Sequence, residues 1–363
     1  MNKRKILLIG CGKAGNKLVN EMMMKDGRYA GLFVNSSYND MSGLEKFSEK
    51  NAFLFSNTNG SGRDRDLAQE YVKEDLQPLV DTIVSYPMQD VVTIFTSADG
   101  GTGSGITPTL IQLLKLTYTR KGLDRKINLV AIIPNFDKDD KVGFRNTLHF
   151  WNEIMDIKDN CIDDIKFIDN SKGESFADIN YRAVEALNNA YTMNGTSDNG
   201  DIDDRDARLF STDKGFGLVL TLSDDYKSAQ KAIDQAIKES VFAIPESFDC
   251  NYLGISVKED SYDLDDIKNC FETVYESTFQ TNNPKHNTIV LGGCEEAPKG
   301  VIEIIKMRLD EIESKSSERK ANKTKFTVDI EKRVDKKPRK SRKATFTEDE
   351  LNDIALMAQE LFK

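Results

Sequence analysis

The chain has 363 residues, 39% of them hydrophobic, and carries a net charge of −10. It is longer than one ordinary hydrophobic core requires, so we expect two folded domains. Its five cysteines are scattered without a C-x-x-C pair and it has two histidines, which argues against a disulfide framework and a structural zinc site. The sequence contains no apolar run of membrane-spanning length and no signal-peptide pattern. We therefore expect a cytoplasmic protein without membrane contact.

Apolar, β-branched runs alternate with helical patterns through the first half of the chain. The predicted strands are residues 6–9, 31–34, 52–55, 91–96 and 127–133, and the predicted helices are residues 14–24, 67–85 and 106–120. Continuous apolar strands that alternate with helices predict an α/β fold with a doubly wound parallel sheet. Ligands of such sheets bind beyond the carboxyl ends of the strands.

The second half of the chain begins with a helical segment, predicted over residues 146–199 and ending in a long helix over residues 175–193. A polar turn over residues 194–206 follows. A smaller α/β domain is then predicted, with strands at 216–222, 252–257 and 288–291 and helices at 226–241, 264–276 and 298–314.

Two glycine turns each follow a predicted strand and precede a predicted helix. The second, SADGGTGSG over residues 97–105, presents backbone N–H groups and a helix start to anionic oxygens, but lacks the lysine of a Walker loop. The first, GCGKAG over residues 10–15, is also the fingerprint of NAD-binding Rossmann oxidoreductases. That alternative needs an acidic residue at the end of the second strand, where this chain has Asn35, and gives the second glycine turn no role.

The run over residues 97–105 resembles the GGGTG[ST]G signature of the tubulin/FtsZ superfamily of polymerising GTPases, with Asp99 in place of the first glycine. The resemblance extends from about residue 5 to residue 314, and it implies binding of GTP and GDP together with Mg²⁺. The residues that it places at the nucleotide are Gly10, Cys11, Gly12, Asn16, Asn35, Ser36, Gly100, Gly101, Thr102, Gly103, Ser104, Asp137, Lys141, Asn170 and Asn180.

Within this set, the resemblance implies that the two glycine turns hold the phosphates and that Asn170 and Asn180 read guanine and its sugar. Asp137 and Lys141 correspond to a Glu and an Arg of the FtsZ sugar loop. The run NGSGR over residues 59–63 occupies the place of the loop that senses the terminal phosphate. No side chain is assigned as a ligand of the cation.

An acidic loop follows the long helix, and the resemblance implies that it acts on the GTP of the neighbouring subunit. In the favoured register, Asp203 and Asp206 are the catalytic pair and Gly215 follows the second acid by nine residues, as in FtsZ. A second register uses Asn199, Asp201 and Asp204. Hydrolysis of a phosphate ester needs an oriented water and managed charge, which two carboxylates can supply. A loop and a site at opposite ends of one subunit generate open, head-to-tail filaments of the chain with itself.

The fold class that follows is tubulin/FtsZ-like, and it divides the chain into five parts. They are a GTP-binding domain (1–174), a central helix with the catalytic loop (175–206), a second, smaller α/β domain (207–297), a C-terminal helix with a basic tail (298–344) and a terminal amphipathic helix (345–363). A capping box formed by Thr347 and Glu350 and an apolar stripe predict this last helix.

The tail decides between branches of the superfamily. Residues 315–343 contain 13 Lys and Arg against 4 Asp and Glu, a charge of +9 that leaves −19 on the rest of the chain. Cell-division FtsZ proteins, the alternative within the superfamily, end instead in a flexible linker and an apolar-acidic peptide. The basic tail resembles that of the TubZ proteins, which move plasmid or phage DNA by binding an adaptor on a centromere. We therefore expect a DNA-segregating GTPase whose tail contacts such an adaptor.

Overall fold

The computed structural model describes residues 1–323 apart from residues 57, 87–88, 272 and 284. Met1–Leu309 form one compact unit and Asp310–Lys363 form a second. The +9 segment beyond residue 323 and the predicted terminal helix over residues 345–363 lie outside the described residues. Among the described helices, none has the length and hydrophobicity needed to cross a bilayer.

A ten-stranded sheet runs through the first unit, in the order β11-β10-β12-β9-β6-β5-β4-β1-β2-β3. Neighbouring strands from β3 to β9 are parallel, whereas β12 is antiparallel to both β9 and β10. The strands are β1 (Ile6–Cys11), β2 (Ala30–Asn35), β3 (Ala52–Leu54), β4 (Val91–Ser97), β5 (Lys126–Ile133), β6 (Asp164–Asp169), β9 (Phe216–Thr221), β10 (Cys250–Val257), β11 (Val274–Asn282) and β12 (Thr288–Cys294). The predicted parallel sheet is therefore confirmed.

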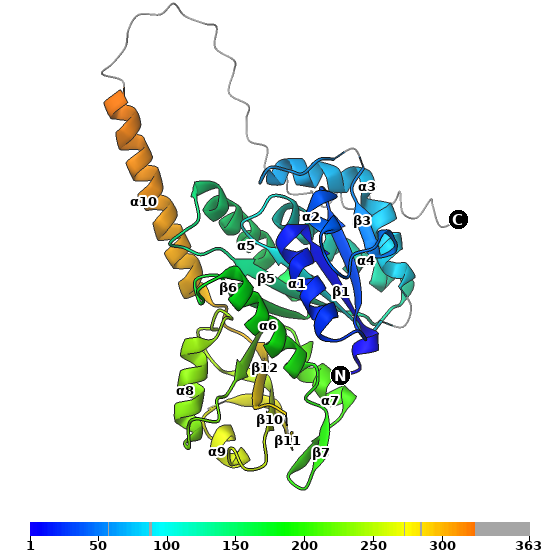
Figure 1. Cartoon of the computed structure of the whole chain (residues 1–363), viewed down its shortest axis with the longest axis vertical. Helices are drawn as coiled ribbons and strands as arrows, with labels where there is room; N and C mark the ends of the chain where they lie inside the picture. The colour runs from blue at the N-terminus through cyan, green and yellow to red at the C-terminus, as the bar shows by residue number, and fades with distance from the viewer. Residues whose placement is uncertain (57, 87–88, 272, 284, 324–363) are drawn as a thin grey trace, which may run out of the picture. The chain divides into compact units, whose positions relative to one another are not determined.

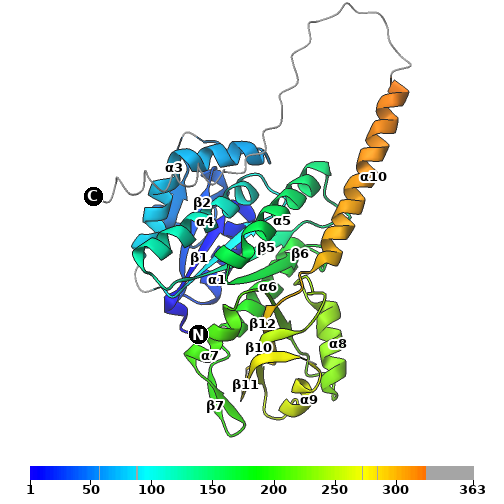
Figure 2. The same ribbon diagram turned by 180° about the vertical axis from the view of Figure 1, so that it is seen from behind.

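Helices cover both faces of the parallel part of the sheet (Figures 1 and 2). Helices α1 and α6 pack together on one face, and α3, α4 and α5 lie on the other. The helices are α1 (Gly12–Lys25), α2 (Asn39–Ser42), α3 (Arg65–Ser85), α4 (Thr102–Lys121), α5 (Lys141–Cys161), α6 (Phe176–Ala190), α7 (Asp204–Ser211), α8 (Ala229–Glu239), α9 (Leu264–Lys268) and α10 (Lys299–Lys323), with short 3-10 turns at Lys3–Lys5 and Glu49–Asn51. The central strands β1, β4 and β5 are buried from both sides, which explains their continuous apolar runs.

The helical prediction for residues 146–199 is wrong in part, because strand β6 lies inside it. Its sequence, DIKFID, carries charges where a central strand normally has apolar residues. Asp164 and Lys166 form a buried ion pair of 2.5 Å, and burial raises the pKa of Asp164. Lys126 pairs with the adjacent Asp163 at 2.9 Å. Paired charges allow a polar sequence to occupy the sheet interior, and this pairing is invisible to a periodicity argument.

Two further elements differ from the prediction. The helix predicted over residues 264–276 ends at Lys268, and the alternating residues that follow form the strand β11. The predicted polar turn over residues 194–206 contains a hairpin of β7 (Gly195–Ser197) and β8 (Gly200–Ile202) and the start of α7. One sheet continues through the predicted boundary at residue 206, joined there by a single parallel register pair, Ile165 with Phe216. The five-part division of the chain stays a prediction.

Candidate functional site

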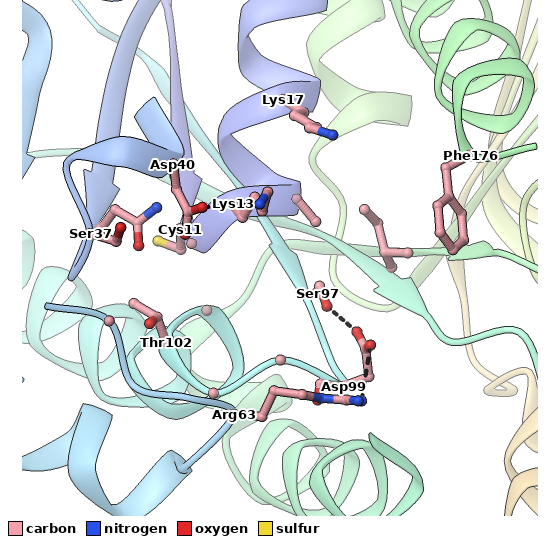
Figure 3. Close-up of a pocket in the computed structure, with 18 of the residues that line it drawn as sticks. Cys11, Lys13, Lys17, Ser37, Asp40, Arg63, Ser97, Asp99, Thr102 and Phe176 are labelled. Atoms are coloured by element: carbon pink, nitrogen blue, oxygen red, sulfur yellow. Dashed lines mark hydrogen bonds and ion pairs between the residues drawn. The ribbon is translucent and has the colours of Figure 1, made fainter. Parts of the chain in front are cut away.

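A cavity of about 750 Å³ lies at the carboxyl ends of β1, β2, β4 and β5, where a doubly wound sheet holds its ligand (Figure 3). Nine of the sequence-predicted nucleotide residues line it: Cys11, Gly12, Asn35, Gly100, Gly101, Thr102, Gly103, Asn170 and Asn180. Ser61 and Arg63 of the predicted terminal-phosphate loop line it too, as does Asp99 of the second glycine turn. Side chains that the prediction did not include also line it, among them Lys13, Lys17, Glu21, Ser37, Asp40 and Phe176.

Two helices begin side by side at the floor of this cavity. Neither α1 nor α4 receives a side-chain cap at its N-terminus within the described part of the chain. A Cβ on Gly12, which has φ of +73°, would lie 2.9 Å from the backbone nitrogen of Gly103, so the two glycine turns touch. Uncapped N–H groups and two helix dipoles at one point form a binding place for an anion such as a phosphate.

Hydroxyl groups tie three loops together at the start of α4. The Thr102 hydroxyl lies 2.7 Å from the Ser36 hydroxyl and 3.0 Å from that of Ser61. Nearby, burial raises the pKa of the Cys11 thiol to about 12, so this side chain is a neutral group at neutral pH. The floor of the cavity is thus polar, and Lys13 and Lys17 line it from the exposed side of α1. Lys13 is paired with Asp40 at 3.1 Å, and Asp40 lines the cavity as well.

A charged cluster closes one side of the cavity, as Figure 3 shows for Arg63 and Asp99. The Arg63 guanidinium lies 3.5 Å from Asp99, 3.0 Å from Asp139 and 3.2 Å from Asp140. Burial raises the pKa of Asp99, and the Asp139 carboxylate adds to the rise. The departure from the family signature at Asp99 is therefore balanced by an arginine from a different loop.

Asn146 holds the loops of that cluster in place. Its buried amide nitrogen donates to the carbonyl oxygens of Arg63 and Asp99 at 3.0 Å and of Gly100 at 3.1 Å. A Cβ on Gly101 would lie 2.7 Å from the backbone of Arg63. The run NGSGR over residues 59–63 thus packs directly on the second glycine turn.

Four predicted nucleotide residues lie behind the cavity wall instead of facing it. Asn16 is fully buried and its amide donates to the carbonyl of Val34 at 3.4 Å, which ties α1 to β2. A Cβ on Gly10 would lie 2.5 Å from the Asn16 side chain. Ser36 bonds to Thr102 as described, and the Ser104 hydroxyl donates to the carbonyl of Gly100. These residues support the turns that face the cavity.

The structure does not bring Asp137 and Lys141 to the cavity. Asp137 is exposed and forms an ion pair of 2.9 Å with Arg308, which is 171 residues away in the sequence. Lys141 is the first residue of α5, after the N-cap residue Asp140. Their assignment to the sugar therefore stays a prediction.

The acidic loop lies at the opposite end of the sheet. Asp203 is the N-cap of α7, where its carboxylate accepts from the backbone N–H groups of Arg205 and Asp206 at 2.7 and 2.9 Å. The Asp206 carboxylate accepts from the N–H of Asp203 at 3.0 Å, which completes a capping box. The backbone N–H of Asp206 lowers the pKa of Asp203, so this exposed carboxylate is ionised at neutral pH.

The position of this loop follows from its neighbours. The start of α7 borders a small cavity together with Lys5 and Asp90, which immediately precede β1 and β4. The nucleotide-sized cavity lies beyond the other ends of the same two strands. In the second register, Asp201 lies within the hairpin strand β8, and the Asp204 carboxylate accepts from the amide of Asn194.

Comparison with known proteins agrees with this architecture. The GTPase domain of the Tubulin/FtsZ family matches residues 5–173. The tubulin-like protein TubZ of a Clostridium botulinum C phage is 28% identical over 295 residues, which cover 81% of this chain and 80% of that protein. The tail-truncated TubZ of Clostridium botulinum phage c-st superposes with a TM-score of 0.78 at 26% identity, covering 87% of this chain and 100% of that one.

A more distant solved structure shares the fold. A GTPγS-form protofilament of Bacillus thuringiensis serovar israelensis TubZ has a TM-score of 0.73 at 16% identity, covering 88% of this chain and 94% of that one. Fold, glycine turns and the match of residues 5–173 to the GTPase domain support one class, a tubulin/FtsZ-like GTPase. Its sequence and fold resemble those of the TubZ proteins. The Rossmann alternative is thereby set aside.

Proposed function

We propose that this chain forms head-to-tail filaments in which each GTP is hydrolysed between two subunits, and that the filament segregates plasmid or phage DNA. The observation that carries the proposal is the placement of the cavity and the acidic loop at opposite ends of β1 and β4. Stacking one subunit on the next along this direction brings the loop of one to the cavity of the other. Such a heterologous contact repeats without closing, and it produces an open filament.

In this proposal the two glycine turns bind the phosphates of GTP or GDP, and the N-termini of α1 and α4 stabilise their negative charge. Asn170 and Asn180 bind the nucleoside end, and Mg²⁺ accompanies the triphosphate as its counter-ion. Phe176 precedes Asn180 by four residues on α6 and lines the same cavity, so it offers an aromatic face to the base.

Asp203 and Asp206 act on the GTP of the adjacent subunit, where one carboxylate orients the attacking water and the other balances the charge of the cation. Their position at the exposed start of α7 supports this register, because a helix N-cap holds a carboxylate in a defined direction. Asp201 in the alternative register belongs to a strand of the β7–β8 hairpin.

Self-association is supported by the related Bacillus thuringiensis TubZ, whose structure is a protofilament in a GTPγS form. Enzymatic turnover then depends on how many subunits are assembled. GTP hydrolysis measured against protein concentration should rise more than linearly above a threshold. A strictly linear dependence, with full activity in dilute protein, would rule out a site shared between subunits.

The segregation role rests on charge. The basic segment over residues 315–343 carries +9 and the rest of the chain −19, so we assign the segment to an adaptor protein bound to DNA. Truncation after Ser314 should preserve polymerisation and hydrolysis but abolish capture of the DNA–adaptor complex. Binding by the full chain should weaken steeply with added salt, because each phosphate neutralised releases a counter-ion. If the truncated protein bound the DNA–adaptor complex with wild-type affinity, the tail would not be the binding segment.

A second truncation separates the two elements of the tail. Removal of residues 345–363 alone takes away the predicted amphipathic helix and keeps the basic run. Loss of adaptor binding would assign recognition to the apolar stripe, and full retention would assign it to the basic run.

A further inference from the structure

The cavity changes its character along α1. Lys13, Lys17 and Glu21 recur every four residues, share one face of the helix and all line the cavity. The face therefore presents two cations and then an anion, counted from the glycine turn. Figure 3 shows Lys13 and Lys17 on successive turns of α1. The lysines suit phosphates, whereas a carboxylate at the far end requires a ligand group that donates hydrogen bonds.

The distance along the helix matches the length of a nucleotide. Glu21 lies nine positions after Gly12, which corresponds to about 13.5 Å at the rise of an α-helix. A nucleotide whose phosphates bind at Gly12 and whose sugar follows α1 brings its base to Glu21. This step rests on the proposed function, because it takes the glycine turns as the phosphate site.

The surroundings of Glu21 place a carboxylate and an amide side by side. The Asn180 amide donates to the Glu21 carboxylate over a long 3.5 Å, and Asn180 is only 8% exposed. Glu21 itself is half-buried, and burial raises its pKa. The side-chain amide oxygen of Asn20, on the same turn, already accepts from the backbone N–H of Lys46 at 2.9 Å. Within the described part of the chain, Glu21 is thus a partly desolvated acceptor that receives one long hydrogen bond, from Asn180, and is attracted by the charge of Lys17.

We propose that Glu21 is the residue that selects guanine, with its carboxylate accepting hydrogen bonds from the N1–H and 2-amino groups of the base. An ionised carboxylate only accepts, and these two groups are adjacent donors on one edge of guanine. The amides of Asn170 and Asn180 are available as donors to the 6-oxo group. Adenine offers a lone pair at N1, which faces the carboxylate unfavourably. A nucleotide that lacks a donor for this carboxylate should bind much more weakly, because the partly buried acceptor is then left unpaired.

The test compares four diphosphates, which avoid hydrolysis, by their affinity for the full chain. The wild type should bind GDP about 10- to 100-fold more tightly than IDP, which lacks the 2-amino group, since a hydrogen bond to a charged acceptor is lost. ADP should bind more weakly than IDP, because it lacks both donors. Equal affinity for GDP and IDP overturns the inference without any variant.

The variant Glu21→Gln converts an acceptor-only group into one that also donates. It should lower GDP affinity about 10- to 100-fold and abolish the preference of GDP over IDP. Its affinity for XDP, which has an oxo group at the 2-position, should exceed that of the wild type. A gain for one base excludes general unfolding as the cause.

Glu185→Gln is the matched control, because this glutamate also joins α1 to α6 but pairs with Lys25 and does not line the cavity. It should keep the wild-type order of affinities. If Glu21→Gln keeps the wild-type ratio of GDP to IDP and gains nothing for XDP, Glu21 does not read the base. If the wild type binds none of the guanine nucleotides, the proposed function itself fails.

Discussion

The nucleotide cavity is shaped by residues without side chains, whereas the acidic loop is held by its side chains. The cavity depends on glycines at which a side chain would collide: a Cβ on Gly103 would lie 2.6 Å from the carbonyl oxygen of Cys11. The acidic loop depends on side chains, since the Asp203 and Asp206 carboxylates hold the start of α7 through the backbone N–H groups. The cavity is formed within one subunit, whereas in the proposed function the exposed loop supplies its charge to a neighbouring subunit. If the proposed function holds, nucleotide binding and hydrolysis should therefore be separable by mutation.

The largest effect is expected in the acidic loop. Asp203→Asn retains a good N-cap residue and removes the charge, so α7 stays capped while hydrolysis falls about 10²- to 10⁴-fold. Affinity for GDP should stay unchanged, because Asp203 lies at the far end of the sheet from the subunit's own cavity. Phosphate release and equilibrium GDP binding measure the two effects.

Asp198→Asn in the hairpin between β7 and β8 is the control and should hydrolyse GTP at the wild-type rate. If Asp203→Asn retained full turnover and Asp204→Asn lost it, the second register would replace the first.

A smaller effect is expected in the cavity. Gly103→Ala places a methyl group 2.5 Å from the Thr96 hydroxyl, and relief of such overpacking costs roughly 1–3 kcal/mol. Nucleotide affinity should fall about 10- to 100-fold if this strain is relieved by displacing the turn that faces the phosphates. Titration with a fluorescent GDP analogue measures the loss.

Gly43→Ala offers a control, since no described residue other than its chain neighbours comes within 4 Å of a Cβ built there. Its affinity should equal that of the wild type. Equal binding by Gly103→Ala and Gly43→Ala would show that contact between the two glycine turns does not shape the site.

The smallest effect is expected at Asp137. Its exposed ion pair with Arg308 contributes about 0–1 kcal/mol, as is usual for surface pairs. Asp137→Asn should therefore lower thermal stability slightly and leave GTP affinity unchanged, because the side chain is outside the cavity. A tenfold loss of GTP affinity would return Asp137 to the nucleotide site.

The same contrast explains how much the sequence predicts. The glycine turns over residues 10–15 and 97–105 could be predicted from the sequence, because their glycines meet a local backbone requirement between a strand and a helix. The strand β6 was not predicted, because the burial of Asp164 depends on its ion pair with Lys166 and on the surrounding sheet. The position of Glu21 on the same helix face as Lys13 could have been predicted from their spacing of eight residues, which is two steps of four.

Contacts between segments that are distant in the sequence could not be predicted. The three partners of Arg63 come from two other loops, and that of Asp137 is Arg308. Neither pairing has a local pattern, so only the folded chain brings these charges together.

The central claim is that one subunit supplies the cavity and the next supplies the acids, and a mixing experiment tests it most directly. Gly103→Ala retains the acids but has an impaired cavity, and Asp203→Asn retains the cavity but lacks a catalytic acid. Each protein alone should hydrolyse GTP slowly. An equimolar mixture should recover a substantial fraction of wild-type turnover, because the acids of one variant meet the GTP of the other. A mixture no more active than the sum of its components would contradict a site shared between subunits.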